Sequence, residues 1–379
     1  MTRREMTLGE RLRRANWLLL ALGVGLSLFG VALVGAASEG QRLDYGWLQL
    51  RWTVLGTALC LLMLAVPYRT IVAWRYVIYG VGLLLLLAVL VAGSGGRSAQ
   101  RWLQIGSFRM QPSELMKVVM VLMLAGFIRY RDHHKHFAGL FWPIVLTLVP
   151  MALIVKQPDL GTALLLLPVL FVMLWTAGAR QKHLGILAGV GIAAAVLVYT
   201  VPGLLKEYQK NRIRAFAMQD SGDKALEESH LHHLLASKTV VGAAPAGGLG
   251  LSEDLHAHVG GLAERHSDFI FPVLVASLGH WGVLLLFGML GLFLFLMLTM
   301  ALRVREPSGR LLAVGLATLF ASQSLINMGM TVGLFPIVGM PLPFLSYGGS
   351  SLLTSFVALG LLLNVGADHP IEFGRGDFE

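Results

Sequence analysis

Asp268 is the residue whose type and position point most directly to chemistry. It stands in the segment ERHSDFIF, where a long polar stretch ends and a long apolar run begins. A carboxylate at the edge of a membrane helix is costly to desolvate, so such a residue is a candidate for function. An Asp is also a good helix N-cap, because its oxygen accepts free backbone N–H groups. Position alone favours the cap, and a general base is the competing interpretation.

A second polar segment reads RWLQIGSFRMQPSELMK and leads into an apolar run. Pro112 suits the first turn of a helix, because its missing N–H would be unpaired there. Glu114 and Lys117 are three residues apart, so they share one face of that helix. The two either neutralise each other or line a polar cavity with Arg101 and Arg109, whose planar guanidinium groups suit phosphate oxygens.

Two further segments interrupt the apolar pattern. In 156–163 (KQPDLGTA), Lys156 and Asp159 can pair; alternatively, Asp159 caps the next helix and Lys156 meets a lipid diphosphate. In 336–351 (PIVGMPLPFLSYGGSS), three prolines and three glycines exclude a regular helix. Irregular backbone at membrane depth persists only where protein or water covers it. This stretch is therefore a re-entrant segment or a close-packed turn beside a cavity.

Histidines gather in the polar stretch that ends at Asp268, at His230, His232, His233, His256, His258 and His266. Their spacing, without a cysteine partner, does not match a structural zinc site. These histidines therefore do not predict a particular metal. The single cysteine, Cys60, cannot form an intrachain disulfide.

The elements that must position these residues are membrane helices. Of the 379 residues, 56% are hydrophobic and 13% are charged, whereas soluble domains carry about 25% charged residues. Runs of about 20 apolar residues span a bilayer. We predict an all-α polytopic membrane protein, one domain over 1–379, with about ten transmembrane helices. These lie near 17–37, 47–66, 72–92, 114–129, 140–156, 160–178, 183–201, 269–301, 311–334 and 350–365.

Basic residues set the predicted orientation. Most of them fall in the N-terminus and alternate loops, and such loops face the cytoplasm. They are Arg3, Arg4, Arg11, Arg13, Arg14, Arg69, Arg75, Arg129, Arg131, Lys135, Arg180, Lys182, Arg303, Arg305 and Arg310. Segments 1–16 and 366–379 are then cytoplasmic, and 202–267 is one large extracytoplasmic loop between the seventh and eighth helices. This topology accounts for the net charge of +9; no basic stripe with interleaved aromatics indicates nucleic acid as a partner.

In order and spacing, the four segments resemble the SEDS family (shape, elongation, division and sporulation) over nearly the whole chain. The residues that carry the resemblance are Arg101, Trp102, Gln111, Pro112, Ser113 and Glu114, with 156–162 (KQPDLGT), 264–271 (ERHSDFIF) and 341–351 (PLPFLSYGGSS). Segments 156–163 and 339–343 are more similar to RodA, the elongation member, than to FtsW, the division member. The chain departs from the family at 241–250 (VGAAPAGGLG), which lacks the usual lysine, and at Ala276 and Ser277, which stand where an acidic pair is usual.

The resemblance implies a peptidoglycan glycosyltransferase of the bacterial cytoplasmic membrane. It would polymerise lipid II into glycan strands during elongation, with its active site on the outer side. Its partners would be membrane lipids, lipid II, the growing strand and a class B penicillin-binding protein that cross-links the product.

The implied roles follow from the reaction, in which a sugar hydroxyl displaces a lipid diphosphate. Asp268 would remove the hydroxyl proton, because partly apolar surroundings make a carboxylate a stronger base. Arg101, Arg109, Lys156 and Lys117 would bind the diphosphate. The supporting residues would be Gln111, Ser113, Glu114, Asp159, Glu264, His266, Ser346 and Tyr347. Mg²⁺ or Mn²⁺ between diphosphate oxygens, with Glu114 and Asp159 as ligands, is compatible with this chemistry, and no organic cofactor is expected.

Three alternatives stay open. A lipid II flippase would use the same cavity and cations but would not need Asp268 as a base. A non-enzymatic scaffold for cell-wall enzymes would not need the charged cavity. Within the family, an FtsW-like division polymerase is the alternative to an elongation polymerase.

Overall fold

A computed structural model describes residues 6–38, 43–93, 101–106, 108–129, 137–201, 207–219, 232–251, 253–262 and 264–368. Ten long helices occupy the ten predicted ranges, and the largest displacement of an end is at Pro307, which was expected at 311. They are α2 (Trp17–Ser38), α3 (Tyr45–Met63), α5 (Arg75–Ala92), α6 (Pro112–Ile128), α7 (Phe141–Lys156), α8 (Leu160–Thr176), α9 (Gln181–Thr200), α14 (Ile270–Arg303), α15 (Pro307–Thr331) and α16 (Gly349–Asp368).

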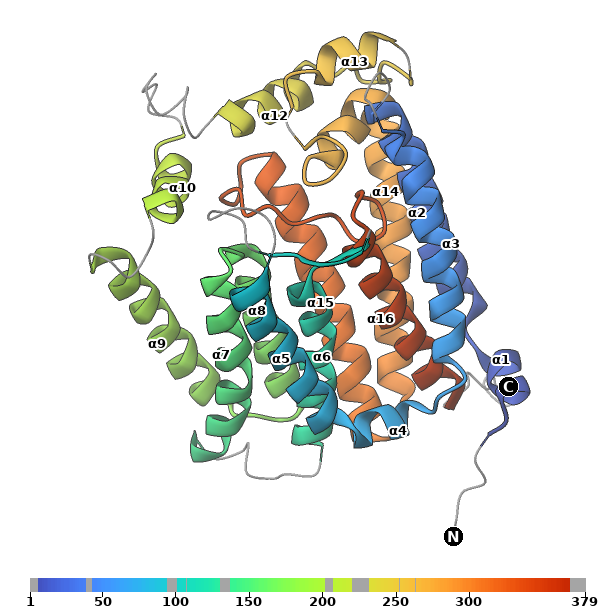
Figure 1. The fold of residues 1–379 in the computed structure, drawn as a ribbon, viewed down its shortest axis with the longest axis vertical. Helices are drawn as coiled ribbons and strands as arrows, with labels where there is room; N and C mark the ends of the chain where they lie inside the picture. Colours follow the sequence, from blue (N-terminus) through green and yellow to red (C-terminus); the bar gives the residue numbers. More distant parts are fainter. Residues whose placement is uncertain are drawn as a thin grey trace, which may run out of the picture.

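Within the described residues, seven of these helices are long and apolar enough to cross a membrane: α2, α5, α7, α9, α14, α15 and α16. The apolar α8 is shorter, with 17 residues. The chain is therefore a mostly helical, multi-pass membrane protein, as predicted, while the count of ten spans stays a prediction. In the bundle, α16 packs along α3, and α15 packs against α14 and α8 (Figure 1). By contrast, α9 stands at the outside and has no buried residue.

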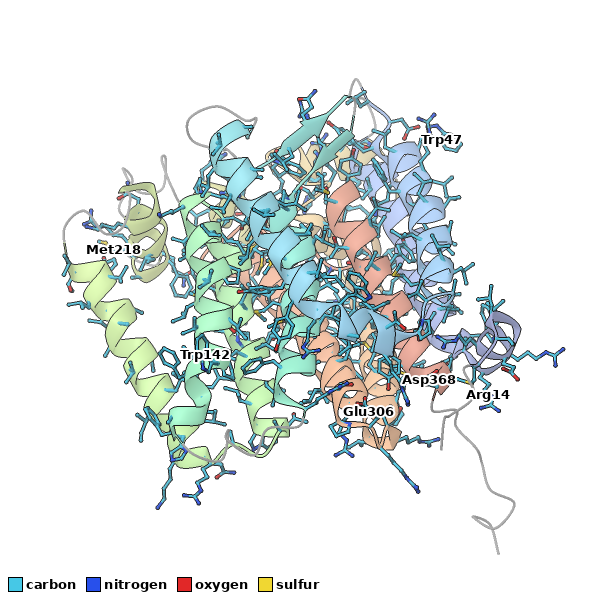
Figure 2. The ribbon with its side chains drawn as sticks, turned by 60° about the horizontal axis from the view of Figure 1, so that its bottom comes forward. Arg14, Trp47, Trp142, Met218, Glu306 and Asp368 are labelled. Atoms are coloured by element: carbon cyan, nitrogen blue, oxygen red, sulfur yellow. The ribbon has the colours of Figure 1, made fainter. Side chains whose placement is uncertain are left out.

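Buried polar contacts bring both ends of the described chain to one end of the bundle. Asn364, near the end of α16, accepts hydrogen bonds from Arg11 Nη1 (3.1 Å) and from Tyr68 N (2.9 Å). Asp368 lies 3.8 Å from Arg11 and 3.4 Å from Arg69. Arg11 belongs to the short helix α1 (Leu8–Arg14), and Tyr68 and Arg69 to α4 (Tyr68–Ala73). We call this the terminal end; Figure 2 places Asp368 there and Trp47 at the other end.

Short strands and helices lie at the opposite end of the bundle, and the sequence did not predict them. Strands β1 (Leu103–Ile105) and β2 (Phe108–Met110) form an antiparallel hairpin ahead of α6. The described part of the 202–267 stretch, which shows no sustained apolar periodicity, contains the helices α10 (Glu207–Ala217), α12 (His232–Ala243) and α13 (Glu253–Val259). His230 lies outside the described residues.

The longest helix, α14, is broken at Gly279, where the backbone adopts φ 58° and ψ −147°. The break exposes main-chain groups, and the loop before α13 binds them. Leu249 N donates to Ala276 O and Gly250 N to Ser277 O, both at 2.8 Å. On the other side of the break, His280 N donates to the carbonyl of Ala246 at 3.0 Å. The loop therefore splints the bend through hydrogen bonds of the main chain.

We expect Gly279→Ala to destabilise the protein. Its torsion angles belong to a region that only glycine adopts readily, and the strain alone costs about 1–3 kcal/mol. A Cβ atom would also overlap the Ala246 carbonyl oxygen and lie 2.6 Å from Gly248 N. Thermal unfolding of purified variants measures the effect.

The matched controls are Gly288→Ala and Gly291→Ala, further along the same helix, where a Cβ meets nothing within 4 Å. Those two should be neutral or slightly stabilising, because alanine favours helix. Equal melting temperatures for all three variants would contradict the steric role of Gly279.

Candidate functional site

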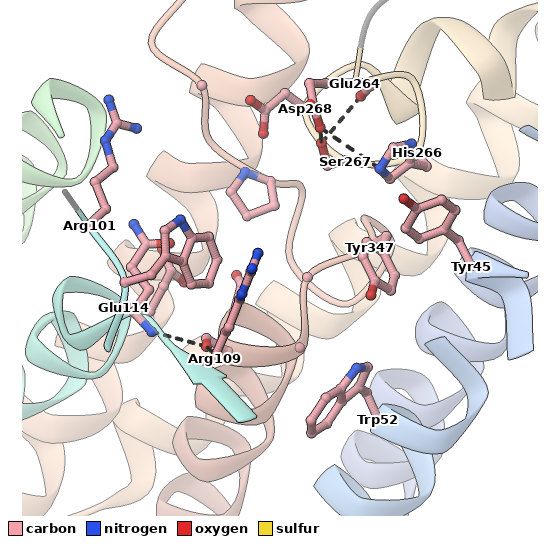
Figure 3. Close-up of a pocket in the computed structure, with 18 of the residues that line it drawn as sticks. Tyr45, Trp52, Arg101, Arg109, Glu114, Glu264, His266, Ser267, Asp268 and Tyr347 are labelled. Carbon is pink, nitrogen blue, oxygen red and sulfur yellow. Dashed lines mark hydrogen bonds and ion pairs between the residues drawn. The ribbon is translucent and has the colours of Figure 1, made fainter. Parts of the chain in front are cut away.

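A cavity of about 710 Å³ opens at the end of the bundle opposite the termini (Figure 3). Its walls come from the start of α3, the hairpin, the start of α6, the turn before α14, the 332–348 segment and the start of α16. The predicted site residues that line it are Arg101, Arg109, Gln111, Glu114, Glu264, His266, Asp268 and Tyr347. With Thr162 of α8, the lining draws on five stretches that are far apart in the sequence.

Asp268 lies in the turn just before α14 and lines the cavity. The N-cap position of α14 is Phe269, so Asp268 is not the cap residue that its position favours. Buried Asn327 donates one hydrogen bond to the Asp268 carbonyl (3.0 Å) and another to the carbonyl of Met340. Gly339, with φ 68°, approaches so closely that a Cβ there would lie 3.1 Å from Asp268 Oδ2. Asn327 thus holds the main chain of the turn, and the missing side chain at Gly339 leaves room for the carboxylate.

The 332–348 segment between α15 and α16 is irregular, as its prolines and glycines predict. It inserts between helices, since the Phe344 ring lies 5.3–5.5 Å from Phe293, Phe320 and Phe356. Ser346 ties it to the Asp268 turn, because its Oγ donates to Ser267 O at 2.6 Å. Ser346 is thus a structural link and does not line the cavity.

The two arginines reach the cavity from the hairpin region. Arg101 precedes β1, and its guanidinium donates to the carbonyl of Pro158, which connects the hairpin to the α7–α8 turn. Arg109 lies in β2, and its carbonyl accepts a hydrogen bond from Ser350 Oγ at 3.2 Å. Gln111 N also donates to Ser350 Oγ, at 3.1 Å. These contacts fix the hairpin against α16, and Arg109 extends into the cavity (Figure 3).

Glu114 and Lys117 form the predicted ion pair. Lys117 Nζ lies 2.9 and 3.0 Å from the two carboxylate oxygens of Glu114 and 2.9 Å from Gln323 Oε1. Lys117 is 2% exposed and lies behind the cavity wall, whereas Glu114 contributes to the wall. Lys117 therefore neutralises Glu114, and its place does not fit the predicted role in diphosphate binding.

Asp159 organises helix starts. One carboxylate oxygen accepts hydrogen bonds from Gln111 Nε2 and Ser113 Oγ, both at 2.9 Å, and the other accepts from Thr162 N at 3.2 Å. Asp159 thus caps α8, which was one of its two predicted roles. No ion pair joins it to Lys156 in the described part of the chain. Lys156 ends α7 outside the cavity lining, so the structure does not bring it to the other cations.

Two cavity aromatics, Tyr45 and Trp52, were missed from the sequence. They are seven residues apart on α3 and therefore share a face of that helix, a spacing that could have indicated them. Tyr45 stacks on His266 with ring centroids 4.3 Å apart. Burial lowers the pKa of His266. The carboxylate of Glu264 raises this pKa and the charge of Arg265 lowers it further, but burial has the largest effect. The imidazole is therefore neutral at pH 7 and suited to ring stacking.

The carboxylates expected to hold a divalent ion are already engaged. Both oxygens of Glu114 accept from Lys117, and both oxygens of Asp159 accept from protein donors. Among the described residues, no group of three or more His, Cys, Asp or Glu side chains could hold a metal ion. Glu114 and Asp159 thus do not fit as metal ligands, and a requirement for Mg²⁺ or Mn²⁺ stays a prediction.

Fold and cavity define a class: a polytopic membrane protein with an arginine- and carboxylate-lined cavity at one end of its bundle. The model of the cell cycle protein family of FtsW, RodA and SpoVE matches residues 11–370. The chain belongs to this family, which confirms the SEDS resemblance.

Named relatives fall on both branches of the family. The chain is 34% identical to the probable peptidoglycan glycosyltransferase FtsW of Trichlorobacter lovleyi, covering 94% of each chain. It is 32% identical to the peptidoglycan glycosyltransferase MrdB of Escherichia coli K12, covering 88% of this chain and 89% of that one.

Solved structures share the fold. One chain, from a peptidoglycan synthase complex described as coordinating polymerization and crosslinking, matches with a TM-score of 0.79, 30% identity and coverage of 94% and 99%. RodA of Thermus thermophilus matches with a TM-score of 0.69, 29% identity and coverage of 94% and 97%.

Proposed function

We propose that this protein is a peptidoglycan glycosyltransferase that polymerises lipid II. The observation that carries the proposal is one cavity lined by the Asp268 carboxylate and by Arg101 and Arg109. Glycosyl transfer from a lipid diphosphate needs both a base and positive charge for the leaving group. The family membership and the names of the relatives support the same activity.

The proposed step uses these groups as follows. Asp268 takes the proton from the attacking sugar hydroxyl while that oxygen bonds to the anomeric carbon of the donor sugar. The bond from that carbon to the phosphate oxygen breaks, and its electron pair leaves with the diphosphate. Arg101 and Arg109 stabilise the released negative charge through charge-assisted hydrogen bonds. The proton ends on the carboxylate, and undecaprenyl diphosphate is the second product.

The test is a polymerisation assay with purified, detergent-solubilised protein, lipid II and a class B penicillin-binding protein. Detergent micelles have no two leaflets, so a flippase or a scaffold yields no polymer, whereas a glycosyltransferase yields glycan strands separable by gel electrophoresis. Absence of strands from correctly folded protein in the presence of the partner would refute the proposal.

We expect Arg109→Ala and Arg101→Ala each to lower the rate of polymerisation about tenfold to a hundredfold. Loss of a hydrogen bond to a charged group costs about 1.5–3 kcal/mol, which sets that range. Steady-state rates with purified variants measure the effect. Lys156→Ala, which changes a cation outside the cavity, is the matched control and should leave the rate near that of the wild type. A control as impaired as the arginine variants would place the diphosphate elsewhere.

We further propose a role in elongation at the cytoplasmic membrane, with both termini cytoplasmic and the cavity on the outer side. The RodA-like segments 156–163 and 339–343 and the fold of Thermus thermophilus RodA support elongation. The FtsW relative at 34% identity favours the alternative, division. Expression in bacteria depleted of either RodA or FtsW separates the two, because an elongation polymerase restores rod shape and a division polymerase restores septation.

A cross-linking partner follows from the same proposal. The solved complex that matches this fold is described as coordinating polymerization with crosslinking. We propose that this chain likewise acts with a class B penicillin-binding protein. Co-purification of the two, together with faster polymerisation when both are present, is the expected result.

A further inference from the structure

One side of the cavity carries aromatic side chains that the proposed chemistry does not use. We call Tyr45, Trp52, His266 and Tyr347 the aromatic wall; all four line the cavity. The rings of Tyr45 and His266 stack with an interplanar angle of 16°. The ring of Tyr347 stands edge-on to both, with its centroid 4.8 Å from that of Tyr45 and 5.7 Å from that of His266. Trp52 lies against Gly349, where a Cβ would come within 2.7 Å of the indole. The wall is thus an ordered arrangement of rings that are each only partly buried.

The aromatic wall is tied to the same turn that carries Asp268. Tyr347 N donates to the carbonyl of His266 at 2.9 Å, and Ser346 Oγ donates to Ser267 O. Gln49, on the α3 face between Tyr45 and Trp52, donates to Ser346 O at 3.1 Å. The arginines belong to a different part of the chain, since Arg101 precedes the hairpin and Arg109 lies in its second strand. Figure 3 shows Tyr45, Trp52 and Tyr347 on one side of Arg109, and Arg101 on the other.

We propose that the aromatic wall is the subsite for the sugar whose hydroxyl Asp268 deprotonates, an inference that rests on the proposed function. The faces of aromatic rings are electron-rich, and a pyranose presents a face of weakly positive C–H groups, so the two stack. The wall also has polar edges, which suit the hydroxyl and amide groups around a sugar. An alkyl chain bound there would cover these polar groups without offering them a hydrogen bond, which is unfavourable.

This placement gives the cavity two separate tasks. The side next to the Asp268 turn would hold the attacking sugar, and the hairpin side would hold the diphosphate of the donor. Variants of the two sides should therefore affect different ligands.

The experiment measures binding of a lipid-free β-1,4-linked GlcNAc–MurNAc tetrasaccharide to the full-length purified protein by saturation-transfer NMR. Trp52→Leu keeps an apolar side chain but removes the aromatic face, and Trp52→Phe restores a face. We expect Trp52→Leu to weaken binding at least tenfold and Trp52→Phe to stay within about threefold of the wild type. Lipid II kinetics of Trp52→Leu should show a raised KM with a smaller change in kcat.

Two controls separate the aromatic wall from other effects. Trp142→Ala removes an exposed tryptophan on α7, remote from the cavity, and should bind the tetrasaccharide normally (Figure 2). Arg109→Ala should retain tetrasaccharide binding but lose inhibition by undecaprenyl diphosphate.

Normal tetrasaccharide binding by folded Trp52→Leu overturns the inference, as does a wild-type protein that polymerises lipid II but does not bind the tetrasaccharide. A wild-type protein that binds the tetrasaccharide through Trp52 but makes no glycan strands overturns the proposed polymerase activity instead. The two failures are therefore distinguishable.

Discussion

Asp268→Asn should lower lipid II polymerisation by about 10²–10⁴-fold, the range that general-base catalysis contributes. Asparagine has nearly the shape of aspartate but cannot accept the hydroxyl proton. The main-chain bond from Asn327 to residue 268 does not depend on the side chain, so the turn should keep its position. Rates from purified variants, with thermal unfolding as a check on folding, give the result.

Asp268→Glu serves as the conservative comparison, because it keeps the base on a longer side chain. Its activity should lie between those of the wild type and Asp268→Asn. If Asp268→Asn made long glycan strands at nearly the wild-type rate, Asp268 would not be the base.

Lys117→Met should produce the largest loss of stability, about 3–5 kcal/mol, the usual result of removing one partner from a buried ion pair. The substitution leaves Glu114, which is 3% exposed, as a charge without its cation. The midpoint of thermal unfolding in detergent should fall accordingly.

The double variant Glu114→Gln/Lys117→Met should recover most of that stability, since it removes both charges together. Recovery identifies uncompensated charge as the cause and separates it from lost packing. A single variant that melts like the wild type would show that water reaches Glu114 and screens it.

Much of the fold could be predicted from the sequence because membrane helices are encoded locally. The apolar run predicted at 17–37 is the helix Trp17–Ser38, and Pro112 starts α6 as its missing N–H suggests. The break at Gly279 could not be predicted, because the apolar pattern continues unchanged across it and the torsion angles depend on a distant loop.

The candidate site was predictable in its residue types and less so in its geometry. Arg101, Arg109 and Asp268 do line one cavity. Lys117 was harder to place, because its position depends on Gln323, which lies 206 residues away. Lys156 was expected beside the other cations but does not line the cavity, because its position at a helix end does not reveal which way it faces.

The main-chain contact across the bend in α14 also determines which substitutions this region tolerates. Segment 241–250 contains no charged residue, and Ala276 and Ser277 are uncharged as well. The two segments touch, since the main-chain N–H groups of Leu249 and Gly250 donate to the carbonyls of Ala276 and Ser277. Uncharged residues thus stand on both sides of this contact. Because main-chain atoms make the junction, side-chain changes at Leu249, Ala276 and Ser277 leave its hydrogen bonds in place, whereas a Cβ at Gly248 or Gly279 would overlap the main chain of the other segment.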